Sequence, residues 1–188
     1  MSFSLFKSSM KLYMSNQSGI GSYNEFADKL TTEYDMCVRR GYQTNNNIPL
    51  SSANKPMMLT LVTIACQKAF AVQKGPHSFI DDIGKGVVAY WSGASLVTPI
   101  PPPIPATGAI ANISTTVATV TNPGTWSPTG PEFPTNNIDD FLSKLESGMK
   151  IHLTTISGLY NTISMYPGFP TIPPAPGVLP FTGWTVPG

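Results

Sequence analysis

The chain has 188 residues, enough for one domain with or without appendages, and its formal net charge is +1. Only 11% of its residues are charged, against about 25% in ordinary soluble domains. A near-neutral chain lacks the basic surface that nucleic acid attracts, so we expect no nucleic-acid partner. A composition this poor in charge indicates instead that much of the surface is buried against other chains.

Residues 1–93 predict a helical domain made of four helices. The first helix is predicted over residues 3–14. The second follows residues 22–25, which have the spacing of a capping box that satisfies free amides at a helix start. The fourth helix is predicted over residues 78–92, where apolar residues again recur on one face.

The third helix, predicted over residues 56–73, is apolar on nearly its whole circumference. A helix of this kind belongs in a core or a membrane, and a bilayer span needs about 20 residues. Because this run is shorter and interrupted, we predict a central buried helix and no membrane partner. Cys66 in this helix and Cys37 in the preceding one are predicted to be buried, reduced thiols, which agrees with synthesis in a reducing compartment.

The second half of the chain has a different composition. Residues 86–131 contain no charge, and 16 of the 19 prolines follow residue 93. Residues 94–135 therefore predict a proline-rich extended arm. Within it, residues 98–105 predict polyproline, and residues 109–121 predict a strand or an extended stretch.

A helical period of apolar residues returns over residues 136–165, weakened at Gly148 and Gly158. We predict one long helix, or two helices joined near Gly148, packed on the helical domain. Residues 166–188 carry seven prolines and predict a C-terminal arm that can be neither a helix nor a central strand. The predicted fold class is mainly α: a compact helical bundle with long proline-rich extended arms and one long helix in the C-terminal half.

Both arms are apolar and contain aromatic residues, unlike disordered segments, which are usually charged. We expect the arms to lie in grooves, on this chain's own helices or on neighbouring subunits. Buried aromatic residues dominate interface energetics, so five of them are the predicted anchors at a protein interface: Trp126, Phe133, Phe169, Phe181 and Trp184. The alternative is that these aromatic residues fold back on the chain's own helices.

Few residues suggest catalysis or metal binding. His77 has Asp81 and Asp82 about one turn further on, a set that could bind a metal or move a proton, but no third ligand has suitable spacing. His152 is predicted to be a polar residue at the edge of its helix. No nucleophile motif is present. We therefore predict no enzyme, and expect no catalytic residue, metal, cofactor or small-molecule substrate.

Four stretches resemble small virion proteins of T4-like tailed phages, especially marine ones: residues 1–14, 32–44 (TEYDMCVRRGYQT), 122–137 (NPGTWSPTGPEFPTNN) and 151–170 (IHLTTISGLYNTISMYPGFP). The resemblance covers most of the chain and is one of pattern. It implies a structural component of the particle, in the head, neck, tail or baseplate, that is synthesised in the host cytoplasm. The implied partners are other virion proteins or copies of the chain itself.

The resulting hypothesis is a non-enzymatic structural subunit that holds its neighbours by apolar, proline-rich arms. One alternative is a self-contained adaptor that presents the polyproline segments at residues 98–105 and 172–176 to a partner. A second is an enzyme with a site around His77 and Asp81. A third is a nucleic-acid packaging protein, against which the near-zero net charge argues.

Overall fold

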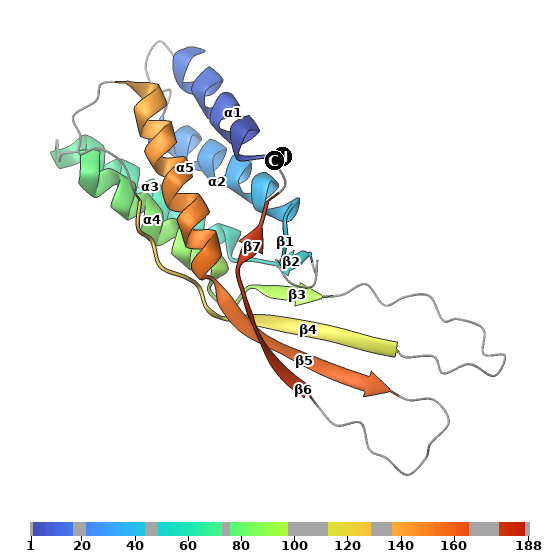
Figure 1. Ribbon diagram of the computed structural model, residues 1–188. Coiled ribbons are helices and arrows are strands. Elements are labelled where there is room, and N and C mark those ends of the chain that lie inside the picture. The colour runs from blue at the N-terminus through green and yellow to red at the C-terminus, as the bar shows by residue number, and fades with distance from the viewer. Residues whose placement is uncertain are drawn as a thin grey trace.

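The structure is a computed structural model that describes residues 2–16, 22–43, 49–72, 76–97, 113–128, 137–165 and 177–186. Within these residues, helices form a bundle, and strands form a sheet that projects from one end of it (Figure 1). The five described helices are α1 (Phe3–Asn16), α2 (Tyr23–Arg39), α3 (Lys55–Val72), α4 (Pro76–Trp91) and α5 (Ile138–Thr155). The prediction of a helical bundle is confirmed.

Capping residues set the ends of these helices. At the start of α2, the Ser22 side chain accepts a hydrogen bond from the backbone N–H of Glu25 at 3.1 Å, as the capping-box spacing predicts. Asn137 accepts from the backbone N–H of Asp139 at 2.9 Å and begins α5. After α4, Gly93 adopts a φ of 71°, a left-handed conformation that favours glycine.

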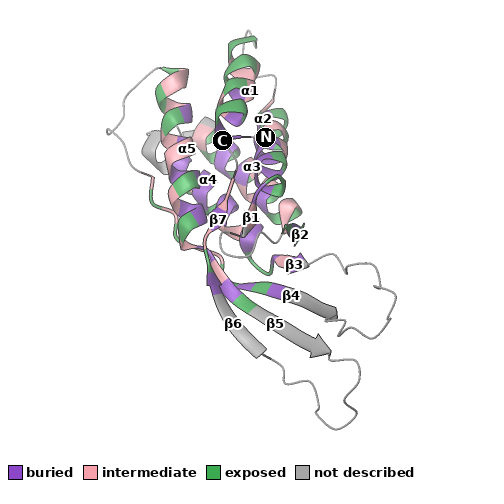
Figure 2. Cartoon of the chain, turned by 45° about the vertical axis from the view of Figure 1, so that its right-hand side comes forward, coloured by how far each residue is buried: buried purple, intermediate pink, exposed green. Residues whose placement is uncertain are grey.

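The helices bury one side each in a common core (Figure 2). α3 packs between α2 and α4, while α1 contacts α2 and α5, and α4 contacts α5. Aromatic residues from α2 and α4 are among the largest fully buried side chains: Tyr34, Tyr90 and Trp91. Because the core collects residues from both halves of the sequence, α5 is an integral part of the bundle.

A five-stranded antiparallel sheet, which the predicted fold class lacks, accompanies the bundle. Its strand order is β2 (Leu50–Ser52), β3 (Ser95–Val97), β4 (Ile113–Asn122), β5 (Ser157–Met165) and β6 (Gly177–Thr182). β4 and β5 pair along their length, and their outer ends extend away from the helices (Figure 1). The fold is therefore a helical bundle joined to a projecting sheet.

The prediction of one long helix, or of a helix pair, over residues 136–165 is confirmed for residues 138–155 and wrong for residues 157–165. α5 ends at Thr155, and the chain continues as β5. Apolar spacing alone favoured a helix here, but a Cβ at Gly158 would overlap the carbonyl oxygen of Thr119 and the ring of Phe181. Gly158 therefore marks a close approach between strands rather than a weak point in a helix.

Where the structure describes the two predicted arms, they form strands. The arm over residues 94–135 contributes β3 and β4, and the arm over residues 166–188 contributes β6 and β7 (Trp184–Thr185). β7 pairs with β1 (Tyr42–Gln43) in a separate two-stranded sheet. β6 lies at the edge of the larger sheet, a position that tolerates Pro180 because one side of an edge strand needs no ladder hydrogen bonds.

Candidate interaction surface

The outer side of α3 carries apolar residues that no described part of the chain covers. Met57 is 46% exposed, Ile64 is 38% exposed, and Leu61 between them is half-buried. Their spacing of four and three residues places them on one face, next to the buried Met58 and Val62. The prediction of a central buried helix is therefore wrong: α3 is apolar all round, but only its inner side lies in the core.

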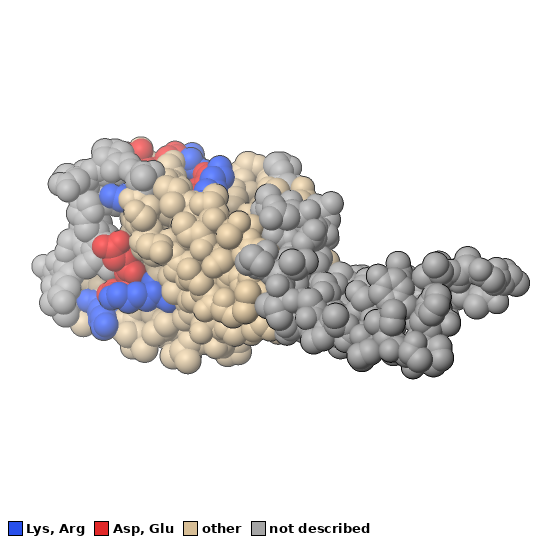
Figure 3. All heavy atoms as spheres, turned by 60° about the horizontal axis from the view of Figure 1, so that its bottom comes forward, with Lys and Arg blue, Asp and Glu red and all other residues tan. Residues whose placement is uncertain are grey.

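The outer face of α3, made of Met57, Leu61 and Ile64, is called the α3 face below. Residues 56–67 contain no charged residue. Charge is also sparse on the side of the molecule drawn in Figure 3, where charged side chains gather at the end far from the sheet and along one edge. Lys68, one turn after Ile64, is the exposed charged residue that ends this stretch. Single exposed apolar residues are ordinary, but several on one helix face are typical of an interaction site. The sequence signal for this face is the all-round apolar pattern of α3, which is equally typical of a buried helix.

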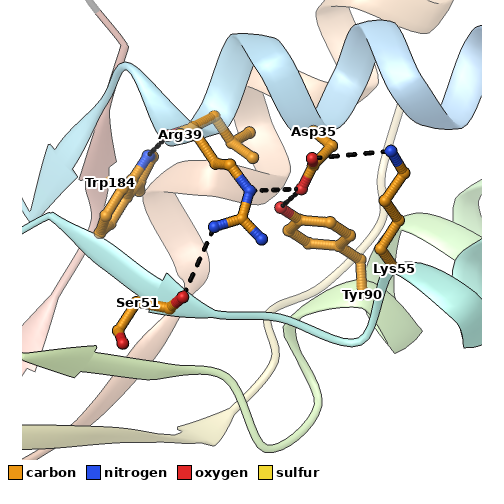
Figure 4. A network of polar contacts seen from close by, with 7 residues as sticks. Asp35, Arg39, Ser51, Lys55, Tyr90 and Trp184 are labelled. Carbon is orange, nitrogen blue, oxygen red and sulfur yellow. Dashed lines mark hydrogen bonds and ion pairs between the residues drawn. The ribbon is translucent and has the colours of Figure 1, made fainter.

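A buried carboxylate fixes the start of α3 against α2 and α4 (Figure 4). Asp35 accepts hydrogen bonds from the Tyr90 hydroxyl at 2.6 Å and from Arg39 Nε at 2.9 Å, and Lys55 Nζ lies 3.7 Å from its second oxygen. Burial, and then the hydrogen bond to Asp35, raise the pKa of Tyr90 far above its ordinary value. The hydroxyl therefore remains a donor, and the network connects α2 to α4 and to the start of α3.

Two of the predicted anchors, Trp184 and Phe181, lie in the chain's own core. The Trp184 ring meets Trp91 edge to face with centroids 5.2 Å apart, and its Nε1 donates to the carbonyl oxygen of Val38 at 3.1 Å. Phe181 is 2% exposed, and its ring packs over Gly158. In this arrangement both side chains are occupied within the chain, which corresponds to the alternative of folding back on its own elements.

A third predicted anchor, Trp126, packs between α4 and α5. A Cβ at Gly84 would overlap its indole, and a Cβ at Gly148 would lie 2.7 Å from the ring. These two helical glycines form a socket that any larger side chain would obstruct. Gly148 does not interrupt α5; its missing side chain makes room for Trp126. The other two anchors, Phe133 and Phe169, lie outside the described residues.

His152 is fully buried, so the prediction that it lies at a polar helix edge is wrong. It follows Leu145 by seven residues and Met149 by three, and therefore shares their inward face. Its ring lies beside Trp126, with centroids 6.5 Å apart, and neither ring nitrogen has a hydrogen-bond partner among the described residues. Burial lowers the pKa of His152 to about 4. The Pro123 backbone has the opposite and smaller effect on this pKa.

Of the groups considered for chemistry, the two thiols are buried and Asp82 is paired. Both cysteines are free and buried, as predicted, and burial raises the pKa of Cys37 to about 11 and that of Cys66 to about 12. Asp82 forms an ion pair with Lys85. The side chain of His77 lies outside the described part of the structure. Within that part, no group of three or more His, Cys, Asp or Glu residues could hold a metal ion.

The polyproline segments at residues 98–105 and 172–176 lie outside the described residues, so the adaptor alternative stays a prediction. None of the helices described above has both the length and the apolar character needed to cross a membrane. Comparison of the chain with protein-family models, with curated proteins and with solved structures finds no match.

Proposed function

We propose that the chain is a non-enzymatic structural subunit of a bacteriophage virion, and that it binds neighbouring subunits through the α3 face. The observation that carries this proposal is a helix face on a folded domain where Met57 and Ile64 are left exposed, with no charged residue between Pro56 and Gln67. The low charge of the whole chain supports the same conclusion, as does its resemblance to small virion proteins. The proposal covers a place in the head, neck, tail or baseplate.

The energetics favour a role in an assembly over a role as an isolated pair. Fully burying a Leu, Ile or Met side chain contributes about 1.5 to 3 kcal/mol, so each partly exposed residue of the α3 face offers about 1 kcal/mol. Association costs at least about 4 kcal/mol in lost freedom of movement. A subunit held on several sides overcomes that cost. We propose that the proline-rich segments, with Phe133 and Phe169, supply further contacts with neighbours.

Incorporation into particles tests this proposal. Ile64→Glu places a charge on the α3 face, and Leu12→Glu is the matched control, because Leu12 is 63% exposed on α1, away from that face. Circular dichroism first establishes that both variants fold. We expect mass spectrometry of gradient-purified particles to detect the wild-type chain and the control, but not Ile64→Glu.

The two parts of the proposal fail separately in this experiment. If purified particles lack the wild-type chain, it is not a virion component. If Ile64→Glu is incorporated as efficiently as Leu12→Glu, the chain is a virion component that does not use the α3 face.

A further inference from the structure

The last described segment of the chain, residues 177–186, pairs with two separate parts of the chain: the preceding strand β5 and the distant strand β1. β6 pairs with β5 from Gly177↔Thr162 to Thr182↔Ser157. β7 then pairs with β1, where Thr185 lies opposite Tyr42. Residues 177–186, called the strap below, therefore supply one strand to each of the two sheets.

Two aromatic side chains of this strap sit in sockets that fit them. A Cβ at Gly41 would overlap the Trp184 indole, and the Trp184 Nε1 is held by the Val38 carbonyl oxygen at 3.1 Å. A Cβ at Gly158 would overlap the Phe181 ring. The surface that receives the strap, called the acceptor surface below, consists of β5, β1 and the spaces beside Gly41 and Gly158 that hold the two aromatic rings.

The connection that precedes the strap is long for a hairpin. Residues 166–176 join β5 to β6 with 11 residues, five of which are proline. Loops in β-hairpins usually have two to five residues. Fully extended, 11 residues reach up to about 36 Å. The connection begins at the outer end of β5, which points away from the bundle (Figure 1). A chain of this length can deliver the strap to an adjacent copy as well as to its own β5.

We propose that residues 177–186 exchange between copies in the assembly, so that the strap of one subunit occupies the acceptor surface of its neighbour. The occupant is thus a second copy of this chain. Contacts within one chain and between two chains are identical, so the balance depends only on the connection and on the concentration of neighbours. A long connection lowers the effective concentration of the chain's own strap, and assembly raises that of a neighbour's strap. The inference rests on the proposed function, because exchange requires adjacent copies.

A disulfide between β5 and β6 reports which copy supplies the strap. Leu159 and Pro180 are Cα partners. Since Pro180 has no N–H, the pair is of the non-hydrogen-bonded type, with Cα atoms about 4.5 Å apart, a distance that a disulfide can span. Leu159→Cys and Pro180→Cys are made in separate full-length chains, co-expressed and oxidised. Native thiols are alkylated before non-reducing electrophoresis.

We expect a covalent dimer from the mixed variants, and no such species from either variant alone. Ser52→Cys and Ser95→Cys, divided between two chains in the same way, form the matched control. These residues pair between β2 and β3, with hydroxyl oxygens 2.7 Å apart, and neither strand belongs to the strap. The control mixture should therefore remain monomeric under the same oxidation.

A single chain that carries both Leu159→Cys and Pro180→Cys completes the test. If it closes within one chain while the mixture stays monomeric, even where sedimentation shows associated copies, the exchange is overturned. If the double variant forms no disulfide at all, the strand pair itself is absent and the inference also fails. Neither result bears on whether the chain enters particles, so this failure is distinct from failure of the proposed function.

Discussion

Trp126 fills the space beside Gly148, so we expect Gly148→Ala to destabilise this chain, although the same substitution stabilises an ordinary helix. In a free helix, Gly148→Ala stabilises by up to about 1 kcal/mol, because alanine has the higher helix propensity. In this structure the new Cβ would lie 2.7 Å from the indole and 3.2 Å from the Pro128 ring. Overpacking of this kind costs about 1 to 3 kcal/mol. We expect Gly148→Ala to lower the free energy of unfolding by about 1 to 2 kcal/mol.

Removing the indole should reverse this effect. Trp126→Ala alone costs about 2 to 3 kcal/mol, less than for a fully buried tryptophan, because Trp126 is only half-buried. In that background the closest contact of the new Cβ is gone, and Gly148→Ala becomes neutral or stabilising. The expected coupling energy between the two sites is therefore about 2 kcal/mol, within the range for residues in contact.

Urea denaturation followed by far-ultraviolet circular dichroism measures all four proteins of this cycle without depending on tryptophan fluorescence. Gly86→Ala in α4 is the control, because Gly86 contacts Val62 and Met58 instead of Trp126. Its cost should be the same in both backgrounds. If Gly148→Ala costs equally with and without Trp126, or stabilises the wild-type chain, the indole does not occupy the socket.

Three further predictions concern other buried groups. His152 has a pKa of about 4 in the fold against 6.5 in the unfolded chain, so between these values the unfolded state binds more protons and the free energy of unfolding decreases as the pH is lowered. Urea unfolding should show about 3 kcal/mol of stability lost from pH 6.5 to 4, and His152→Leu should remove this loss. Trp184→Ala should destabilise by about 3 to 5 kcal/mol in thermal or urea unfolding, and Trp184→Phe by less, because it keeps a ring against Trp91 and loses the hydrogen bond to Val38. Asp35→Ala should cost about 3 kcal/mol, because it leaves the Tyr90 hydroxyl without its acceptor and Arg39 without its carboxylate; Tyr90→Phe combined with it should cost less than the sum of the two single changes.

Local signals in the sequence predicted the helices well. The Ser22 cap and the left-handed Gly93 depend on residues within one turn of the helix end, so a single sequence contains what is needed to place them. The reduced state of Cys37 and Cys66 likewise follows from their place in apolar helical patterns. For these features, sequence neighbours are also the structural neighbours that matter.

A strand was predicted within residues 109–121, where β4 lies, but the rest of the sheet was missed because its pairings depend on other parts of the chain. Residues 157–165 share apolar spacing with a helix over their first turns, and only pairing with β4 and β6 decides for a strand. The same limit applies to glycine. Gly148 and Gly158 were interpreted as weak points of a helix, but each makes room for an aromatic side chain from another segment, Trp126 or Phe181. A glycine's partner across the fold cannot be read from its own neighbours.

The two surfaces proposed for association differ in whether a single folded chain already covers their apolar residues. The strap fills its sockets with Trp184 and Phe181 whether the strap comes from the same chain or from a neighbour, so a separate subunit leaves no large apolar surface there. The α3 face has no such substitute among the described residues, and Met57 and Ile64 stay exposed until another protein covers them. Among the described residues, a free subunit therefore leaves the α3 face uncovered. Contact through that face brings copies close together, and proximity is the condition under which strap exchange becomes favourable. Ile64→Glu should consequently reduce the covalent dimer formed by the Leu159→Cys and Pro180→Cys mixture, whereas the double variant in one chain should still close its disulfide.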